Sequence, residues 1–370
     1  MRKRDVIPLL ALIAASAALW LVPGPRLLAH DEGRTARARV VSTDDANMEK
    51  LGLVDYGTQH LEVEILDGPE RGRRFKAGNE VRAQLDIDKI FRPGDTALVV
   101  VPPGGAKEGE TLVARDHWRN GWGAAFFLLF CALLCWFGGW TGAKALFSFV
   151  FSCLVVWKAV VPLCLRGWPA SWTVFGAVCI LTGVIMYLVA GPTRKGLAAF
   201  SGAMLGVFAG LALAHLFGAL MHINGATLPY VQALLNSGCE SLDLADVFVG
   251  AAVLASSGAV MDLAMDVAAG VDEVARRNPE LPARELWRSG VRIGRSVVGT
   301  MTTTLLLAYS GGYITLLMVF AAQGTKPADF LNSTLVSAET VKTLVGSFSL
   351  VLVAPCTALA GAFILKGKRK

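Results

Sequence analysis

The sequence predicts an α-helical polytopic membrane protein of about eight transmembrane helices, together with a small all-β domain outside the cytoplasm. The first observation is composition: 54% of the 370 residues are hydrophobic, only 17% are charged, and the mean hydropathy is +0.52. Soluble globular domains carry about 25% charged residues. The second is that charge is dense from Arg26 to Arg119 and sparse beyond it. The third is that the sparse part divides into apolar runs of spanning length.

The first apolar run, Val6–Pro23, follows the basic residues of Met1-Arg2-Lys3-Arg4. Residues 1–25 are therefore expected to be an N-terminal signal anchor, with a cleaved signal peptide as the alternative. Residues 120–370 are expected to form a seven-helix transmembrane domain. Its expected spans are Gly121–Phe137, Ala143–Leu165, Ser171–Ala190, Gly196–Met221, Leu244–Gly270, Val297–Ala322 and Val341–Leu365.

Basic residues between these runs predict the orientation. The loop Asn224–Asp243 contains no Lys or Arg, and Gln323–Thr340 contains only Lys326, whereas the segment 271–296 is rich in arginine. Lys and Arg accumulate in the cytoplasmic loops of membrane proteins. Eight spans with both termini in the cytoplasm place the basic segments on the cytoplasmic side. Adding or removing one span would place some of them outside.

The exported segment 26–119 has the pattern of a small β-domain. Gln59–Leu66 alternates as a half-buried strand does, and Asp67–Gly72 has the residues of a turn. Five or six short strands in this segment predict an OB-like barrel. Because no run of aromatic residues marks a binding face, a structural or docking role is expected for it.

Several short motifs resemble one known family. They are Pro93-Gly94-Asp95, Ser257-Gly258-Ala259-Val260-Met261-Asp262, Gly299-Thr300-Met301 with Leu305–Tyr309, Val345-Gly346-Ser347 and Pro355-Cys356-Thr357-Ala358. In combination they resemble the YibE/F-like family of bacterial membrane proteins. The family pattern has Asn at the position of Thr303 and a small polar residue at that of Asp266. The resemblance implies a helical fold in the bacterial cytoplasmic (inner) membrane, with transport as its conjectured activity.

Two carboxylates in the sixth expected span are the sharpest candidates for a site. Asp262 and Asp266 are four residues apart and so share one helix face. Ionisable groups within a bilayer are costly and commonly functional, so this pair predicts a cation or proton site. The alternative is a structural ion pair with Arg292 or Arg295 at the start of the next span.

Further polar residues extend this candidate solute or ion site over the last three spans: Ser257, Thr300, Thr303, Tyr309 and Glu339. The Gly311-Gly312 pair is expected to break the seventh span, as in helices that line transport sites. The alternative is that the threonines bond to their own helix and the glycines serve helix packing.

Two other patterns predict structural roles. Gly202, Gly206 and Gly210 recur every four residues and predict a helix-packing face. Arg284, Arg288, Arg292 and Arg295 share one face of the basic amphipathic segment 271–296, which predicts contact with anionic lipid headgroups at the cytoplasmic surface.

These patterns favour a permease or channel for a small solute or ion. The alternative is a non-transporting membrane platform whose outer β-domain docks a partner. An enzyme is not expected, because neither a Gly-x-Ser-x-Gly elbow nor an HExxH motif occurs. Without a CxxC pair or a basic stripe with interleaved aromatics, no metal, cofactor or nucleic-acid binding is expected, and the sequence leaves the oligomeric state open.

Overall fold

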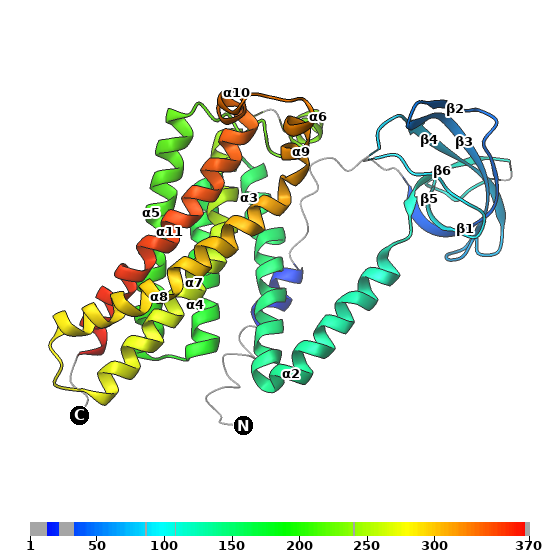
Figure 1. Ribbon diagram of the computed structural model, residues 1–370. Coiled ribbons are helices and arrows are strands. Elements are labelled where there is room, and N and C mark those ends of the chain that lie inside the picture. Colours follow the sequence, from blue (N-terminus) through cyan, green and yellow to red (C-terminus); the bar gives the residue numbers. More distant parts are fainter. Residues whose placement is uncertain (1–12, 22–32, 86, 108, 240, 367–370) are drawn as a thin grey trace. The chain divides into compact units, whose positions relative to one another are not determined.

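The computed structural model describes residues 13–21, 33–85, 87–107, 109–239 and 241–366. The chain divides into two compact units (Figure 1). One comprises residues 26–133 and contains the β-domain, and the other comprises residues 1–25 and 134–370 and contains most of the helices.

The β-domain is a closed five-stranded barrel with one added strand. Its strands are β1 (Arg34–Asp44), β2 (Met48–Leu51), β3 (Val54–Ile65), β4 (Arg74–Arg82), β5 (Thr96–Val101) and β6 (Thr111–His117). Strands β1, β5, β6, β4 and β3 form a ring that β1–β3 pairing closes, and β2 extends β3 as a hairpin. All pairs are antiparallel except β4–β6. This Greek-key order confirms the predicted small barrel.

Alternating side chains fill the barrel, and a buried amide pair fixes its longest connection. Phe75 and Ala77 of β4 point inward with Phe91, which lies between β4 and β5. The Gln59 side chain donates to the Phe91 carbonyl at 2.9 Å and accepts from the Phe91 amide at 3.0 Å, and Asn79 donates to Gln59 at 3.2 Å. Burial of these amides is tolerated because they bind one another and the backbone.

The first long helix is broken by a glycine. Helix α2 (Asn120–Val155) contains one non-helical residue, Gly139, with φ 51° and ψ −128°. It continues through a π-helical turn (Val156–Val160) into α3 (Val161–Leu165). The expected spans Gly121–Phe137 and Ala143–Leu165 lie on either side of this break.

The remaining expected runs lie largely within longer helices, and the short helices α6 (Val231–Asn236) and α10 (Pro327–Asn332) lie in the expected loops. The other helices are α4 (Ala170–Ala190), α5 (Arg194–Leu220), α7 (Leu244–Arg277), α8 (Ala283–Gly312), α9 (Ile314–Ala322) and α11 (Thr334–Leu365). Within the described residues, five helices are long and apolar enough to cross a membrane, or six if the bent pair α8–α9 counts as one. Of the first expected run, residues 13–21 are helical and the rest lies outside the described residues.

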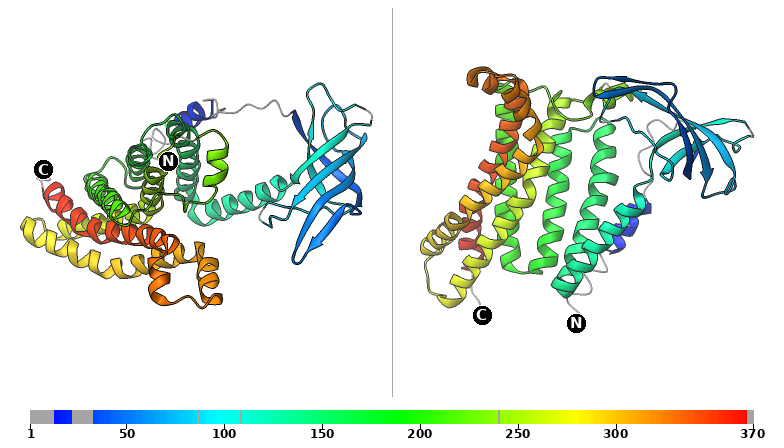
Figure 2. Two further views of the ribbon diagram at one scale, coloured as in Figure 1. Left: turned by 90° about the horizontal axis from the view of Figure 1, so that it is seen from above. Right: turned by 45° about the vertical axis from the view of Figure 1, so that its right-hand side comes forward.

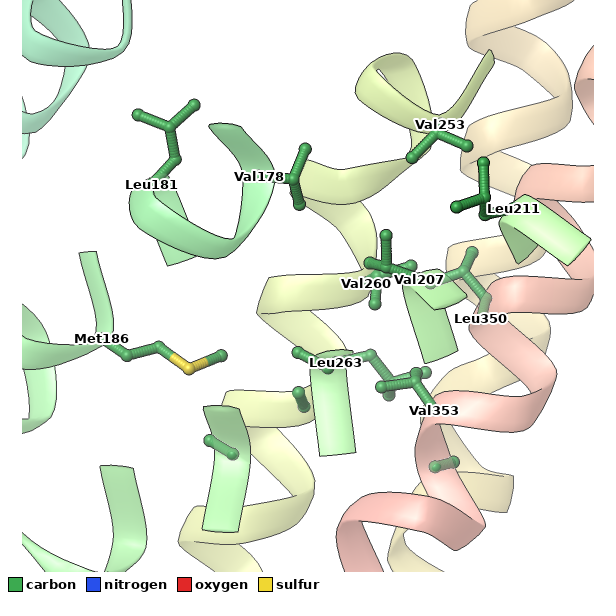
Figure 3. Packing of buried hydrophobic residues seen from close by; sticks show 14 of the residues in the cluster. Val178, Leu181, Met186, Val207, Leu211, Val253, Val260, Leu263, Leu350 and Val353 are labelled. Atoms are coloured by element: carbon green, nitrogen blue, oxygen red, sulfur yellow. The ribbon is translucent and has the colours of Figure 1, made fainter. Parts of the chain in front are cut away.

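Helix α7 is the centre of the helical unit. It packs against α4, α5, α8 and α11, and α11 also packs against α5 and α8 (Figures 1 and 2). Figure 3 shows buried apolar side chains of this core, among them Val178 of α4, Val207 of α5, Leu263 of α7 and Val353 of α11.

Small residues allow α5 and α11 to approach closely. A Cβ atom on Gly202 would lie 2.0 Å from Thr357 Oγ1, and one on Gly210 would lie 2.0 Å from Ser349 Oγ. A Cβ on Gly206 would lie 2.9 Å from the Cβ of Val353. The glycines predicted as a packing face therefore all lie against α11.

Candidate functional site

One face of α7 is left open by its neighbours. The exposed residues on this face are Ala251, Ala255, Gly258, Asp262 and Asp266. Their spacing of three or four residues places them in one stripe along the helix. The other faces of α7 are covered by α4, α5, α8 and α11, so the stripe lies on its uncovered side.

The two carboxylates in this stripe are unpaired. Within the described ranges, neither Asp262 nor Asp266 forms a hydrogen bond or an ion pair with another residue. The same part of the chain offers no partner to Arg292 or Arg295, which are exposed on α8. Among the described residues, the structure therefore contains no ion pair between these acids and these arginines within one chain.

The packing of α7 against α8 shows which residues lie at the same level. A Cβ atom on Gly290 would lie 2.7 Å from Val271, and one on Gly294 would lie 3.5 Å from Val267. The two helices run antiparallel, so each step toward the start of α7 matches a step toward the end of α8. Continuing this register places Asp266 level with Arg295 and Asp262 level with Gly299.

Hydroxyl groups line α8 at the level of Asp262. Thr300 and Thr303 are exposed and donate to the carbonyls of Val297 and Gly299 at 2.9 and 3.0 Å. Donation to their own helix leaves the oxygen lone pairs of both hydroxyls available to a cation or to water. Ser257, by contrast, is buried and donates to the Leu254 carbonyl at 2.7 Å.

Glu339 and Tyr309 belong to a second, enclosed cluster. The Glu339 carboxylate lies 2.6 Å from the ammonium of Lys342, and their side chains are only 22% and 16% exposed. The Lys342 ammonium also lies 5.6 Å from the centre of the Phe248 ring. The Tyr309 hydroxyl is buried without a hydrogen-bond partner among the described atoms.

The seven predicted site residues therefore do not form one constellation. Phe248, which marks the enclosed cluster, precedes Asp262 by 14 residues of the same helix, about 21 Å at 1.5 Å per residue. Asp262, Asp266, Thr300 and Thr303 lie on the open α7–α8 face, whereas Tyr309 and Glu339 lie near the other end of α7.

The predicted break in the seventh span is present. Helix α8 ends at Gly312, and α9 leaves it at an angle of 63° after the single residue Tyr313. The Tyr313 and Ser310 hydroxyls lie 3.2 Å apart at the bend. Such a bend frees backbone carbonyls that need other partners.

The arginines predicted to contact lipid all lie on α8. Arg284, Arg288, Arg292 and Arg295 are exposed, and Arg288 donates to Glu285 at 3.1 Å. The predicted amphipathic segment 271–296 is divided between two helices. Residues 271–277 form the end of α7, and residues 283–296 form the first part of α8.

One cluster is not apparent from the sequence. His215 Nε2 of α5 lies 3.2 Å from the hydroxyl of Ser171 on α4 and 3.9 Å from the carboxylate of Asp246 on α7. Asp246 also accepts a bond from the Ser171 amide at 3.1 Å. His215 and Asp246 border a cavity of about 170 Å³. Because they come from three helices, no local spacing signals their proximity, and a lone histidine in an apolar run has no sequence signature.

Comparison with protein families matches residues 126–367 to the family described as YibE/F-like protein. The matched region runs from the first arm of α2 to the end of α11 and leaves out the β-domain. No curated protein and no solved structure matches the chain.

Proposed function

The chain belongs to the YibE/F-like family, and from the polar face of α7 and α8 we propose that it is a permease or channel for a small solute or ion, with a cation as the first candidate. In this proposal it resides in the bacterial cytoplasmic membrane and crosses it eight times. The two arms of α2 each make one crossing, and the bent pair α8–α9 makes another. Both termini are cytoplasmic, and the β-domain lies outside. The uneven distribution of Lys and Arg among the loops supports this orientation.

Asp262 is the observation that carries the proposal. It lies well inside α7, on the uncovered face of the helix, and has no ion-pair partner among the described residues. Holding a carboxylate within a bilayer costs several kcal/mol, and such residues commonly mark proton or ion pathways. A carboxylate without a fixed counter-ion is free to bind and release a proton or a metal cation.

The surroundings of Asp262 suit a cation rather than an anion. The Thr300 and Thr303 oxygens occupy neighbouring levels of α8. Oxygen ligands of this kind are those that hard cations prefer. The bend between α8 and α9 adds the discontinuity found in helices that line transport sites.

Cation flux into proteoliposomes tests the proposal. The purified protein is reconstituted, a potassium diffusion potential is imposed with valinomycin, and proton and sodium entry are followed with trapped indicator dyes. Wild-type protein is expected to conduct, and Asp262→Asn is expected to lose most of the flux. Glu273→Gln is the matched control, because Glu273 is an exposed acid on the same helix that is paired with Arg277. Equal flux in wild type and Asp262→Asn would remove Asp262 from the mechanism.

The alternative of a docking platform is favoured by one feature of the β-domain. A groove of about 790 Å³ lies over β1, β3, β4 and the segment before β6. Its lining includes both signs of charge, with Glu62 and Arg74 among them. Replacing residues 26–119 with a flexible linker discriminates the two functions. Retained flux favours transport by the helices alone, whereas absence of flux from wild type and variant alike favours the platform.

A further inference from the structure

The open face of α7 continues onto α8. On α8 the exposed residues on the same side include Arg292, Ser296, Gly299, Thr300 and Thr303. This surface therefore combines several hydroxyls and a series of Gly and Ala residues with Asp262, Asp266 and Arg292, which have no ion-pair partner in the part of the chain that the structure describes. Lipid is a poor cover for such a surface, because the acids would remain uncompensated in hydrocarbon.

The charges on this surface are complementary to each other but are not joined within one chain. Asp266 is level with residue 295 of α8, so Arg292 lies three residues, or about 4.5 Å, closer to the α7–α8 connection. An arginine side chain is long enough to span that difference. Within one chain both side chains are exposed on neighbouring helices, and no ion pair joins them among the described residues.

We propose that this face is covered by the same face of a second copy of the chain, related by a two-fold axis along the membrane normal. Such an axis preserves the level of every residue, so Asp266 of one copy meets Arg292 of the other, and the contact occurs twice. A self-complementary patch of this kind is what a two-fold interface requires.

The small residues on the face allow the two copies to approach. Ala251, Ala255 and Gly258 of α7 and Gly299 of α8 present almost no side chain. Small residues at spacings of three or four bring spanning helices into close contact, where hydroxyls bond across the interface. In the dimer, Asp262, Thr300 and Thr303 of both copies are enclosed between the helices instead of facing lipid.

Cysteine cross-linking in membranes tests the contact without relying on transport. Two differently tagged, cysteine-free copies are co-expressed, one carrying Asp266→Cys and the other Arg292→Cys. One of the two symmetric ion pairs then remains intact in the mixed dimer. A short membrane-permeant bismaleimide, which spans more than the about 7 Å between Cα atoms that a disulfide allows, is expected to yield a cross-linked band containing both tags.

The matched control replaces Asp266→Cys with Leu205→Cys on α5, which is 52% exposed. This second pairing is expected to give no linked band. Absence of the band from the first pairing, or equal bands in both, would overturn the proposal. Either result would leave lipid or a different protein as the cover of this face.

Charge reversal supplies an independent test. Energy transfer between labelled copies in liposomes measures dimer formation for Asp266→Arg, Arg292→Asp and the combination of both. Each single change places like charges opposite each other and is expected to weaken the dimer by at least about tenfold, because such contacts cost several kcal/mol. The combined variant is expected to restore it.

Failure of the combined variant to dimerise, while its thermal unfolding in detergent matches wild type, would contradict the Asp266–Arg292 contact. A variant that does not fold leaves the decision to the cross-linking result. For the wild-type protein, cation flux without a dimer would overturn only the interface, and a dimer without cation flux would overturn only the transport function.

Discussion

Lys342 and Glu339 form an ion pair inside the helical unit, with the ammonium 2.6 Å from the carboxylate and 5.6 Å from the centre of the Phe248 ring. The two residues are one helical turn apart on α11, and more than three-quarters of each side chain is buried. It neutralises two charges that would otherwise each be costly in this environment. The enclosed cluster is separate from the open face that carries Asp262, and we expect a structural role for its ion pair.

Removing one member of this pair is expected to destabilise the protein. Lys342→Met leaves the Glu339 carboxylate covered and uncompensated, which costs about 3 kcal/mol for a mostly buried pair. Thermal unfolding in detergent measures the effect. The double variant Lys342→Met with Glu339→Gln is expected to recover most of the loss, and equal destabilisation of the single and double variants would show that the pairing contributes nothing.

Gly202 is expected to tolerate no side chain. The Cβ of Gly202→Ala would lie 2.0 Å from Thr357 Oγ1 and 2.5 Å from the Thr357 Cα atom, so α5 and α11 must separate. Overpacking of this kind costs about 3 kcal/mol. Gly218→Ala on the same helix is the control, because its added Cβ meets nothing within 4 Å. That variant is expected to be neutral or to gain up to about 1 kcal/mol from helix propensity.

Asp67 is expected to make the β-domain sensitive to acid. Burial acts to raise the pKa of Asp67, but the side-chain and backbone hydrogen bonds from Arg37, at 3.0 and 2.9 Å, outweigh it and hold the pKa below its usual range. Because the folded-state pKa is lowered, the stabilisation is present above the unfolded pKa and is lost as pH falls through the folded value.

The measurement compares residues 26–119 with and without Asp67→Asn by chemical unfolding. Wild type is expected to be more stable by about 1 kcal/mol at neutral pH, a size typical of a partly exposed pair. The two proteins should converge as pH falls below the folded pKa of Asp67. A difference that stays constant down to that pH would show that the ionised carboxylate is not the source.

Much of the fold follows from local patterns in the sequence. Alternation along Gln59–Ile65 and the turn residues that follow predict the hairpin of β3 and β4, because strand periodicity is a property of neighbouring residues. The bend after Gly311-Gly312 is predicted for the same reason, since a glycine pair weakens any helix that contains it. The break at Gly139 falls in the expected gap between two apolar runs.

The arrangement of the site is not predictable in the same way. Helical spacing places Asp262 and Asp266 on one face but does not say which helix covers that face. Their exposure depends on how α4 and α8 flank α7, which long-range packing decides. The proximity of His215 to Asp246 likewise depends on α5 lying beside α7.

Potential-driven cation flux through wild type, Asp262→Asn and Asp262→Glu tests the central claim most directly. Reconstituted wild type is expected to admit protons or sodium under an imposed negative potential. Asp262→Asn is expected to reduce the flux at least about tenfold by removing the ionisable group, and Asp262→Glu is expected to retain part of it. The control Glu273→Gln should match wild type. Flux through Asp262→Asn equal to that of wild type would contradict a transport path at this carboxylate.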